Sequence, residues 1–152
     1  MNKRLYIAYG SYLASQQMNH KCPTAKPIAK GWIFDHRLVF QGHLHGATAN
    51  VIPEKGQDVP VVIWEITAAD ERALDDYLGG SYMKETKEIE VAGEMKEALI
   101  YVMPPRPYGI PADSYLASIV WGYNEFNFPI DILNEAVIHS QANTKYQHPA
   151  AQ

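Results

Sequence analysis

Residues 5–13, LYIAYGSYL, join a short apolar run to a glycine turn and the start of another element. Residues 5–9 are typical of a short buried strand, and Gly10-Ser11 marks a sharp turn at its end. A strand that leads through such a turn into a helix directs backbone N–H groups outward, where they can bind a carboxylate or an oxyanion. An ordinary strand-to-helix turn has the same local pattern. No Lys follows the glycine, so this is not a nucleotide-binding loop.

Outward from this turn, the chain contains several segments with the composition of strands. They are residues 28–34, 37–40, 47–52, 59–66, 82–91 and 97–103. Residues 59–66 are apolar at nearly every position, which predicts a central strand buried on both faces. The short polar breaks between the other segments favour antiparallel pairing.

Four helices are predicted, over residues 13–20 and 68–78 and starting near residues 113 and 129. Thr67 with Asp70 resembles a capping box for the second of them. Four of the ten prolines lie in the loop of residues 104–113. After Ser140 the chain is polar and shows no periodicity, which indicates a weakly ordered tail.

These elements predict an α+β fold. We expect one domain over residues 1–140, built as a closed or partly open, mostly antiparallel β-barrel of about six strands flanked by helices, and a tail over residues 141–152. Closing the barrel would remove the exposed edges that a meander of strands otherwise has.

Composition excludes several classes of protein. The 152 residues carry a net charge of −4, which provides no broad basic face for nucleic acid or anionic lipid. No apolar run reaches the roughly 20 residues that cross a bilayer. The single cysteine, Cys22, allows no internal disulfide and is typical of a reducing compartment. We therefore expect a cytoplasmic protein with neither nucleic-acid nor membrane partners.

Two further features have weak chemical signals. His43-Leu44-His45 places two imidazoles on one side of an extended chain, but no third ligand has a suitable spacing, so no metal and no cofactor is predicted. Cys22 would need a neighbouring base and an electropositive setting to be a nucleophile, which favours a structural role.

Several motifs together resemble the γ-glutamylcyclotransferase-like family, and they occur in the family's order. The segments are residues 5–11 (LYIAYGS), 22–25 (CPTA), 37–40 (RLVF), 59–67 (VPVVIWEIT), 74–77 (LDDY) and 111–115 (PADSY). The resemblance runs from about residue 5 to residue 138. It implies an enzyme fold on which a γ-glutamyl-amine or γ-glutamyl-amino acid closes to 5-oxoproline and releases its amine.

The resemblance also implies the residues of a binding site. The substrate loop would be formed by Tyr9, Gly10, Ser11, Tyr12 and Leu13, and the pocket wall by Tyr82 and Tyr115. The expected ligand is a small carboxylate or a γ-glutamyl compound.

The sequence departs from the family at two positions. Tyr12 stands where the family has Asn, and Leu78 stands where the family has its general acid/base Glu. No acidic residue lies between Tyr77 and Tyr82, and this stretch is about two residues shorter than usual. Leucine can neither accept a proton from the attacking amine nor give one to the leaving nitrogen.

Two hypotheses therefore remain. In the first, another acid replaces the missing Glu; the candidates are Asp75, three residues before Leu78 on the same helix face, and Glu85 on the following strand. In the second, the protein is an inactive homologue that binds a small carboxylate or a protein partner.

Overall fold

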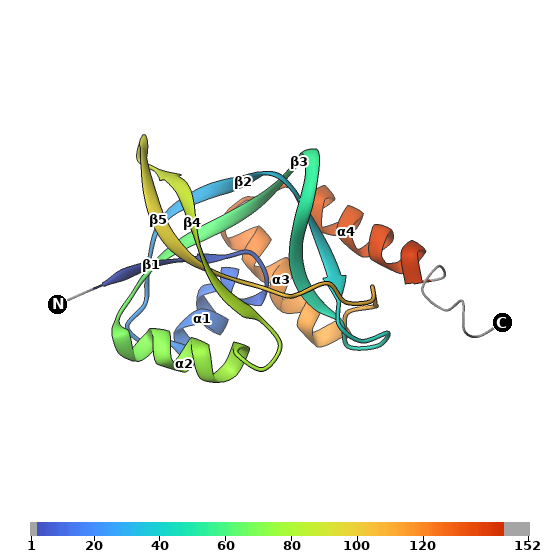
Figure 1. Cartoon of the computed structure of the whole chain (residues 1–152), viewed down its shortest axis with the longest axis horizontal. Coiled ribbons are helices and arrows are strands. Elements are labelled where there is room, and N and C mark those ends of the chain that lie inside the picture. The colour runs from blue at the N-terminus through green and yellow to red at the C-terminus, as the bar shows by residue number, and fades with distance from the viewer. Residues whose placement is uncertain (1–2, 145–152) are drawn as a thin grey trace.

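A computed structural model describes residues 3–144 of the chain (Figure 1). The elements are β1 (Arg4–Ala8), the 3-10 helix η1 (Ser11–Leu13), α1 (Ser15–Lys21), β2 (Lys26–Gln41), β3 (Thr48–Ile66), α2 (Ala68–Leu78), β4 (Met83–Val91), β5 (Glu94–Val102), α3 (Asp113–Glu125) and α4 (Ile130–Asn143). The strands form one five-stranded sheet with the order β2-β3-β1-β5-β4. All pairs are antiparallel except β1 with β5. The predicted α+β class is confirmed.

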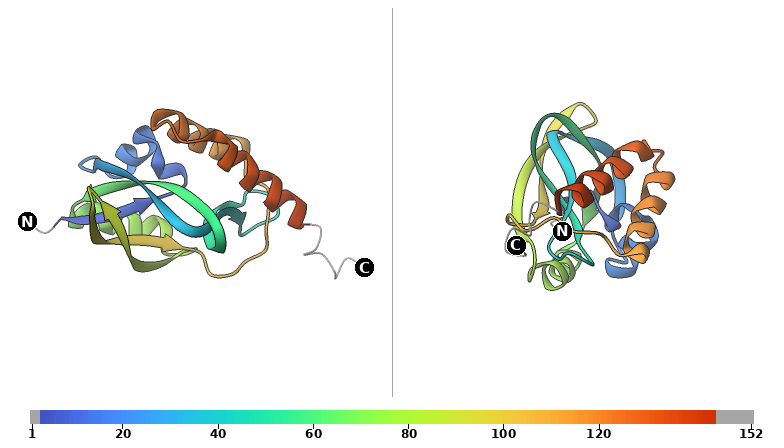
Figure 2. Two further views of the ribbon diagram at one scale, coloured as in Figure 1. Left: turned by 90° about the horizontal axis from the view of Figure 1, so that it is seen from above. Right: turned by 90° about the vertical axis from the view of Figure 1, so that its right-hand side faces the viewer.

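Of the two expected forms, closed or partly open, the closed barrel is wrong, and the sheet has five strands where about six were expected. Strand β2 unites the predicted segments 28–34 and 37–40, and β3 unites 47–52 and 59–66, so the sheet has five strands. Within the described residues, β2 and β4 are the two edges of the hydrogen-bonded sheet, which therefore curves without closing (Figures 1 and 2).

A bulge explains why the polar break in the sequence does not end β2. Asp35 has a φ of 57°, and the register with β3 shifts between Phe34 and His36. The Asp35 carboxylate accepts a hydrogen bond from the Gly56 N–H at 3.0 Å, and the Asp58 carboxylate accepts one from the Asp35 N–H at 3.3 Å. Phe34 pairs with Asp58 and His36 pairs with Pro53, so β3 has the extra residues at this point, and the hairpin bends while pairing continues on both sides.

Helix α2 has the bounds that the sequence predicted. The Thr67 hydroxyl accepts from the Asp70 N–H at 3.2 Å, and the Asp70 carboxylate accepts from the Thr67 N–H at 3.1 Å. Asp70 also accepts from the Thr24 hydroxyl at 2.8 Å. The capping box fixes where the helix begins, and its last residue is therefore Leu78.

The C-terminal helices cover one flank of the sheet. Figure 2 shows α3 and α4 side by side, with α4 against β2 and α3 against η1. Pro129 precedes the first residue of α4, as predicted, but the helix continues to Asn143. Ser140 is buried, and its hydroxyl accepts from the Phe40 N–H at 2.8 Å, which attaches this end of the helix to β2. The predicted tail thus begins too early, and residues 145–152 lie outside the described residues.

No helix within residues 3–144 is long and apolar enough to span a membrane.

A buried hydroxyl in α3 provides the first test of this packing. Tyr123 is fully buried, its ring packs edge-on against Phe128, and its hydroxyl has no hydrogen-bond partner among the described residues. Replacing Tyr123 by Phe removes a polar group that is poorly placed, so the free energy of unfolding should rise by about 1 kcal/mol. Urea unfolding followed by circular dichroism measures this change. A less stable variant would show that the hydroxyl has a bound water or another partner.

Candidate functional site

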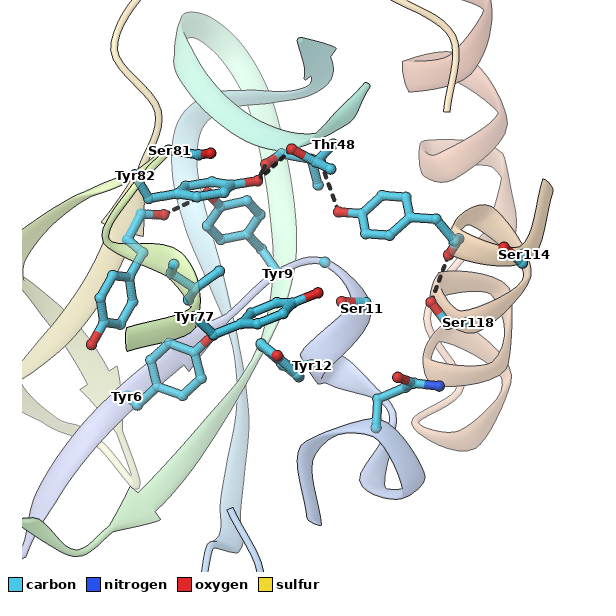
Figure 3. A pocket seen from close by; sticks show the side chains of 16 residues that line it. Tyr6, Tyr9, Ser11, Tyr12, Thr48, Tyr77, Ser81, Tyr82, Ser114 and Ser118 are labelled. Atoms are coloured by element: carbon cyan, nitrogen blue, oxygen red, sulfur yellow. Dashed lines mark hydrogen bonds between the residues drawn. The ribbon is translucent and has the colours of Figure 1, made fainter. Parts of the chain in front are cut away.

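A cavity of about 490 Å³ lies between η1, β1, the C-terminal end of α2 and the first turns of α3 (Figure 3). Sixteen residues line it. Seven of them are tyrosines, out of ten in the chain, and none of the sixteen is charged. The wall is therefore built from phenol rings and neutral polar groups.

Six of the seven predicted binding residues line this cavity: Tyr9, Gly10, Ser11, Tyr12, Tyr82 and Tyr115. The seventh, Leu13, does not, because its side chain is fully buried in the core. Strand β1 ends just before the glycine turn, and η1 begins immediately after Gly10.

The backbone of this turn has free donors. The Leu13 N–H donates to the Gly10 carbonyl at 3.0 Å and the Ala14 N–H to the Ser11 carbonyl at 3.4 Å. Within residues 3–144, the N–H groups of Ser11 and Tyr12 have no acceptor in hydrogen-bonding geometry. A Cβ atom on Gly10 would lie 3.1 Å from the Ala49 Cβ, so glycine allows the loop to lie close to β3.

Hydrogen bonds between neighbouring elements hold the tyrosines in place (Figure 3). The Tyr9 hydroxyl donates to the Tyr101 carbonyl at 2.6 Å, and the Tyr82 hydroxyl donates to the Ala49 carbonyl at 2.7 Å. The Tyr115 hydroxyl oxygen accepts from the Ala49 N–H at 2.8 Å. Burial raises the pKa of Tyr9, Tyr82 and Tyr115, so these phenols stay neutral at physiological pH.

Asp75, the first candidate for a replacement acid, does not line the cavity. Its Oδ1 accepts from the Tyr101 hydroxyl at 2.6 Å, and its Oδ2 contacts the Lys84 Nζ at 3.0 Å. Burial alone would raise the pKa of Asp75, but hydrogen bonds from Tyr101 and Lys84 outweigh it and lower the pKa. Asp75 is thus an ionised carboxylate whose oxygens already have partners, and the Tyr101 phenol lies between it and the cavity.

Glu85, the second candidate, belongs to a different cavity. It lines a hollow of about 370 Å³ that Met103 and Lys87 also line, and it is absent from the wall of the tyrosine-lined cavity. At the end of α2, the residues that line the tyrosine-lined cavity are Tyr77 and Leu78. No aspartate or glutamate is among the described residues that form this wall.

Sequence reasoning missed several wall residues, including Tyr6, Thr48 and Tyr101. Tyr6 could have been predicted as a wall residue, because it lies in the first strand and belongs to the same motif as Tyr9. Thr48 and Tyr101 come from β3 and β5, and no local pattern places them beside the glycine turn.

The remaining candidates from the sequence are Cys22 and the pair of His43 and His45. Cys22 is fully buried, and burial followed by the negative charge of Asp70 raises the pKa of its thiol to about 12. The sulfur therefore stays protonated and unreactive at neutral pH. Among residues 3–144, no three His, Cys, Asp or Glu side chains gather as a metal site, the His43 and His45 pair included.

Comparisons with known proteins agree with the fold. A family model described as gamma-glutamyl cyclotransferase, AIG2-like, matches residues 6–121. The chain is 27% identical over 138 residues to human gamma-glutamylcyclotransferase. This alignment covers 84% of this chain and 73% of the human protein.

Solved structures share the fold at low sequence identity. A gamma-glutamyl cyclotransferase superimposes with a TM-score of 0.79 at 22% identity, covering 89% of this chain and 86% of that one. YkqA from Bacillus subtilis has a TM-score of 0.75 at 18% identity, covering 94% of this chain and 56% of that one. The match to the family model spans most of the chain and includes the glycine turn, α2 and the start of α3. This chain is therefore a member of the gamma-glutamyl cyclotransferase, AIG2-like family.

Proposed function

We propose that this protein binds a small carboxylate ligand in the tyrosine-lined cavity and lacks the proton-transfer step of 5-oxoproline formation. One observation carries the proposal: among residues 3–144, no acidic side chain lines the cavity, and Leu78 lies on its wall at the end of α2.

The reaction depends on a base within reach of the attacking nitrogen. The α-amino group of a γ-glutamyl compound is mostly ammonium at neutral pH and must lose a proton before it attacks the γ-carbonyl. A general base must lie within about 3 Å, or within one bridging water, of that proton. Leu78 has no such group, and the phenols of Tyr9, Tyr82 and Tyr115 have raised pKa values and hold their protons.

Binding does not need a base. The volume of about 490 Å³ is within the range of small-molecule sites. The hydroxyl groups of the wall, and the backbone N–H groups of Ser11 and Tyr12 that have no acceptor within residues 3–144, can donate to a ligand's carboxylate. The described wall of the cavity therefore has groups that orient a ligand but no carboxylate to accept the proton.

Two measurements on the purified protein test this function. Incubation with γ-glutamyl dipeptides should give no 5-oxoproline above the rate without protein, and titration calorimetry with 5-oxoproline should give a saturable isotherm. Turnover by the native chain would overturn the proposal. If Asp75→Asn abolished that turnover, Asp75 acting through Tyr101 would be the replacement acid instead. Binding of no small carboxylate would also overturn the proposal.

A further inference from the structure

Three backbone carbonyls of residues that line the cavity already accept side-chain hydrogen bonds. The Tyr101 carbonyl receives the Tyr9 hydroxyl, and the Ala49 carbonyl receives the Tyr82 hydroxyl. The Tyr115 carbonyl receives the hydroxyl of Ser118 at 2.5 Å. These three backbone oxygens are therefore already hydrogen-bonded, and the side-chain acceptors of the described wall, such as those of Gln17 and Ser11, are neutral.

Several donors on the same wall have no acceptor. The Tyr115 hydroxyl oxygen already accepts from the Ala49 N–H, so its own proton points elsewhere. Within residues 3–144, the hydroxyls of Tyr6 and Tyr12 form no hydrogen bond, although Tyr6 is only 5% exposed and both residues line the cavity. Burial raises the pKa of all three phenols, so they remain donors at neutral pH.

The wall thus has spare donors and occupied backbone acceptors, and this difference distinguishes the carboxylate of an amino acid from its ammonium. A carboxylate only accepts hydrogen bonds and fits spare donors, whereas an ammonium has three donors and no acceptor. The described wall has no carboxylate, so an ammonium there would lose its hydration without gaining a counter-charge, which is unfavourable even if neutral oxygens such as that of Gln17 accept from it. Asp75, whose partner Tyr101 lines the cavity, already has Tyr101 and Lys84 on its two oxygens.

We propose that the cavity selects small carboxylates whose α-nitrogen is absent or acylated, including lactam acids, and rejects α-amino acids that carry a free ammonium. This preference rests on the proposed function, because it describes the ligand of the same cavity. The selected class corresponds to the product of lactam formation and excludes the γ-glutamyl compounds that enter the reaction.

Titration calorimetry on matched ligand pairs tests the preference. N-acetyl-L-glutamate should bind at least about 10-fold more tightly than L-glutamate, and 5-oxoproline at least about 10-fold more tightly than L-proline, equivalent to about 1.4 kcal/mol or more. Equal or tighter binding of the free amino acids would overturn the preference and leave the carboxylate-binding function intact. Binding of neither member of either pair would overturn the binding function, and the preference with it.

Phenol-to-phenyl substitutions test the spare donors. Tyr6→Phe and Tyr12→Phe keep each ring and remove one donor, so each should weaken N-acetyl-L-glutamate binding about 10-fold while the melting temperature changes little. Tyr123→Phe makes the same chemical change outside the cavity and should leave the affinity unchanged. If both cavity variants bound as tightly as the native chain, the hydroxyls would not be the recognition groups and the proposal would be wrong.

Discussion

Leu78→Glu is expected to create 5-oxoproline-forming activity, with a rate about 10²- to 10⁴-fold above that of the native chain. Leu78 lies on the cavity wall at the last residue of α2, and it is partly exposed, so a longer polar side chain can occupy this position. A carboxylate here would accept the proton of the attacking ammonium and return one to the leaving nitrogen. It would also supply a counter-charge for the ammonium, which no described residue of the native wall provides.

The measurement is the release of 5-oxoproline from γ-glutamyl dipeptides. Leu78→Gln is the matched control, since it has nearly the same shape as the glutamate but cannot accept the proton, and it should remain at the native rate. A bell-shaped or sigmoidal pH dependence present only in the Glu variant would assign the activity to the new carboxylate. A folded Leu78→Glu protein with no activity would show that the missing carboxylate is not what separates this chain from catalysis.

Signals from residues close together in the sequence predicted the part of the fold that such residues determine. The capping residues Thr67 and Asp70 fixed the start of α2, and its predicted bounds are confirmed. The expected strand count failed because Asp35 and Gly56 have the composition of turn residues, whereas in the structure they form a bulge inside a continuous hairpin. A bulge and a turn have similar sequences, and the pairing on either side of them decides between the two.

The candidate site was predictable where it is local in sequence. The turn at Gly10 and its neighbours line the cavity because strand, turn and helix follow one another directly. The position of Asp75 was not predictable in this way. Helical spacing places Asp75 on the same face as Leu78. In the structure, Tyr101 and Lys84 of the β4–β5 hairpin bind the Asp75 carboxylate, and these contacts depend on how that hairpin packs against α2.

Gly122→Ala is expected to lower the free energy of unfolding by about 2–3 kcal/mol and to weaken ligand binding at the same time. A Cβ atom on Gly122 would lie 2.7 Å from the Leu13 Cβ and 2.9 Å from the Ala14 backbone nitrogen. Backbone atoms cannot rotate away as a flexible side chain can, so α3 and η1 must separate. Ser11 and Tyr12 belong to η1, and Tyr115 belongs to α3, so this separation would widen the cavity between its two walls.

Urea unfolding and calorimetry with N-acetyl-L-glutamate measure the two effects. Gly80→Ala is the matched control, because a Cβ atom at Gly80 would meet nothing within 4 Å, and both properties should stay near those of the native chain. A Gly122→Ala protein with native stability would show that α3 and η1 are packed less tightly than the structure indicates. Lost stability with unchanged affinity would show that this helix contact supports the fold alone and that the ligand does not depend on the distance between η1 and α3.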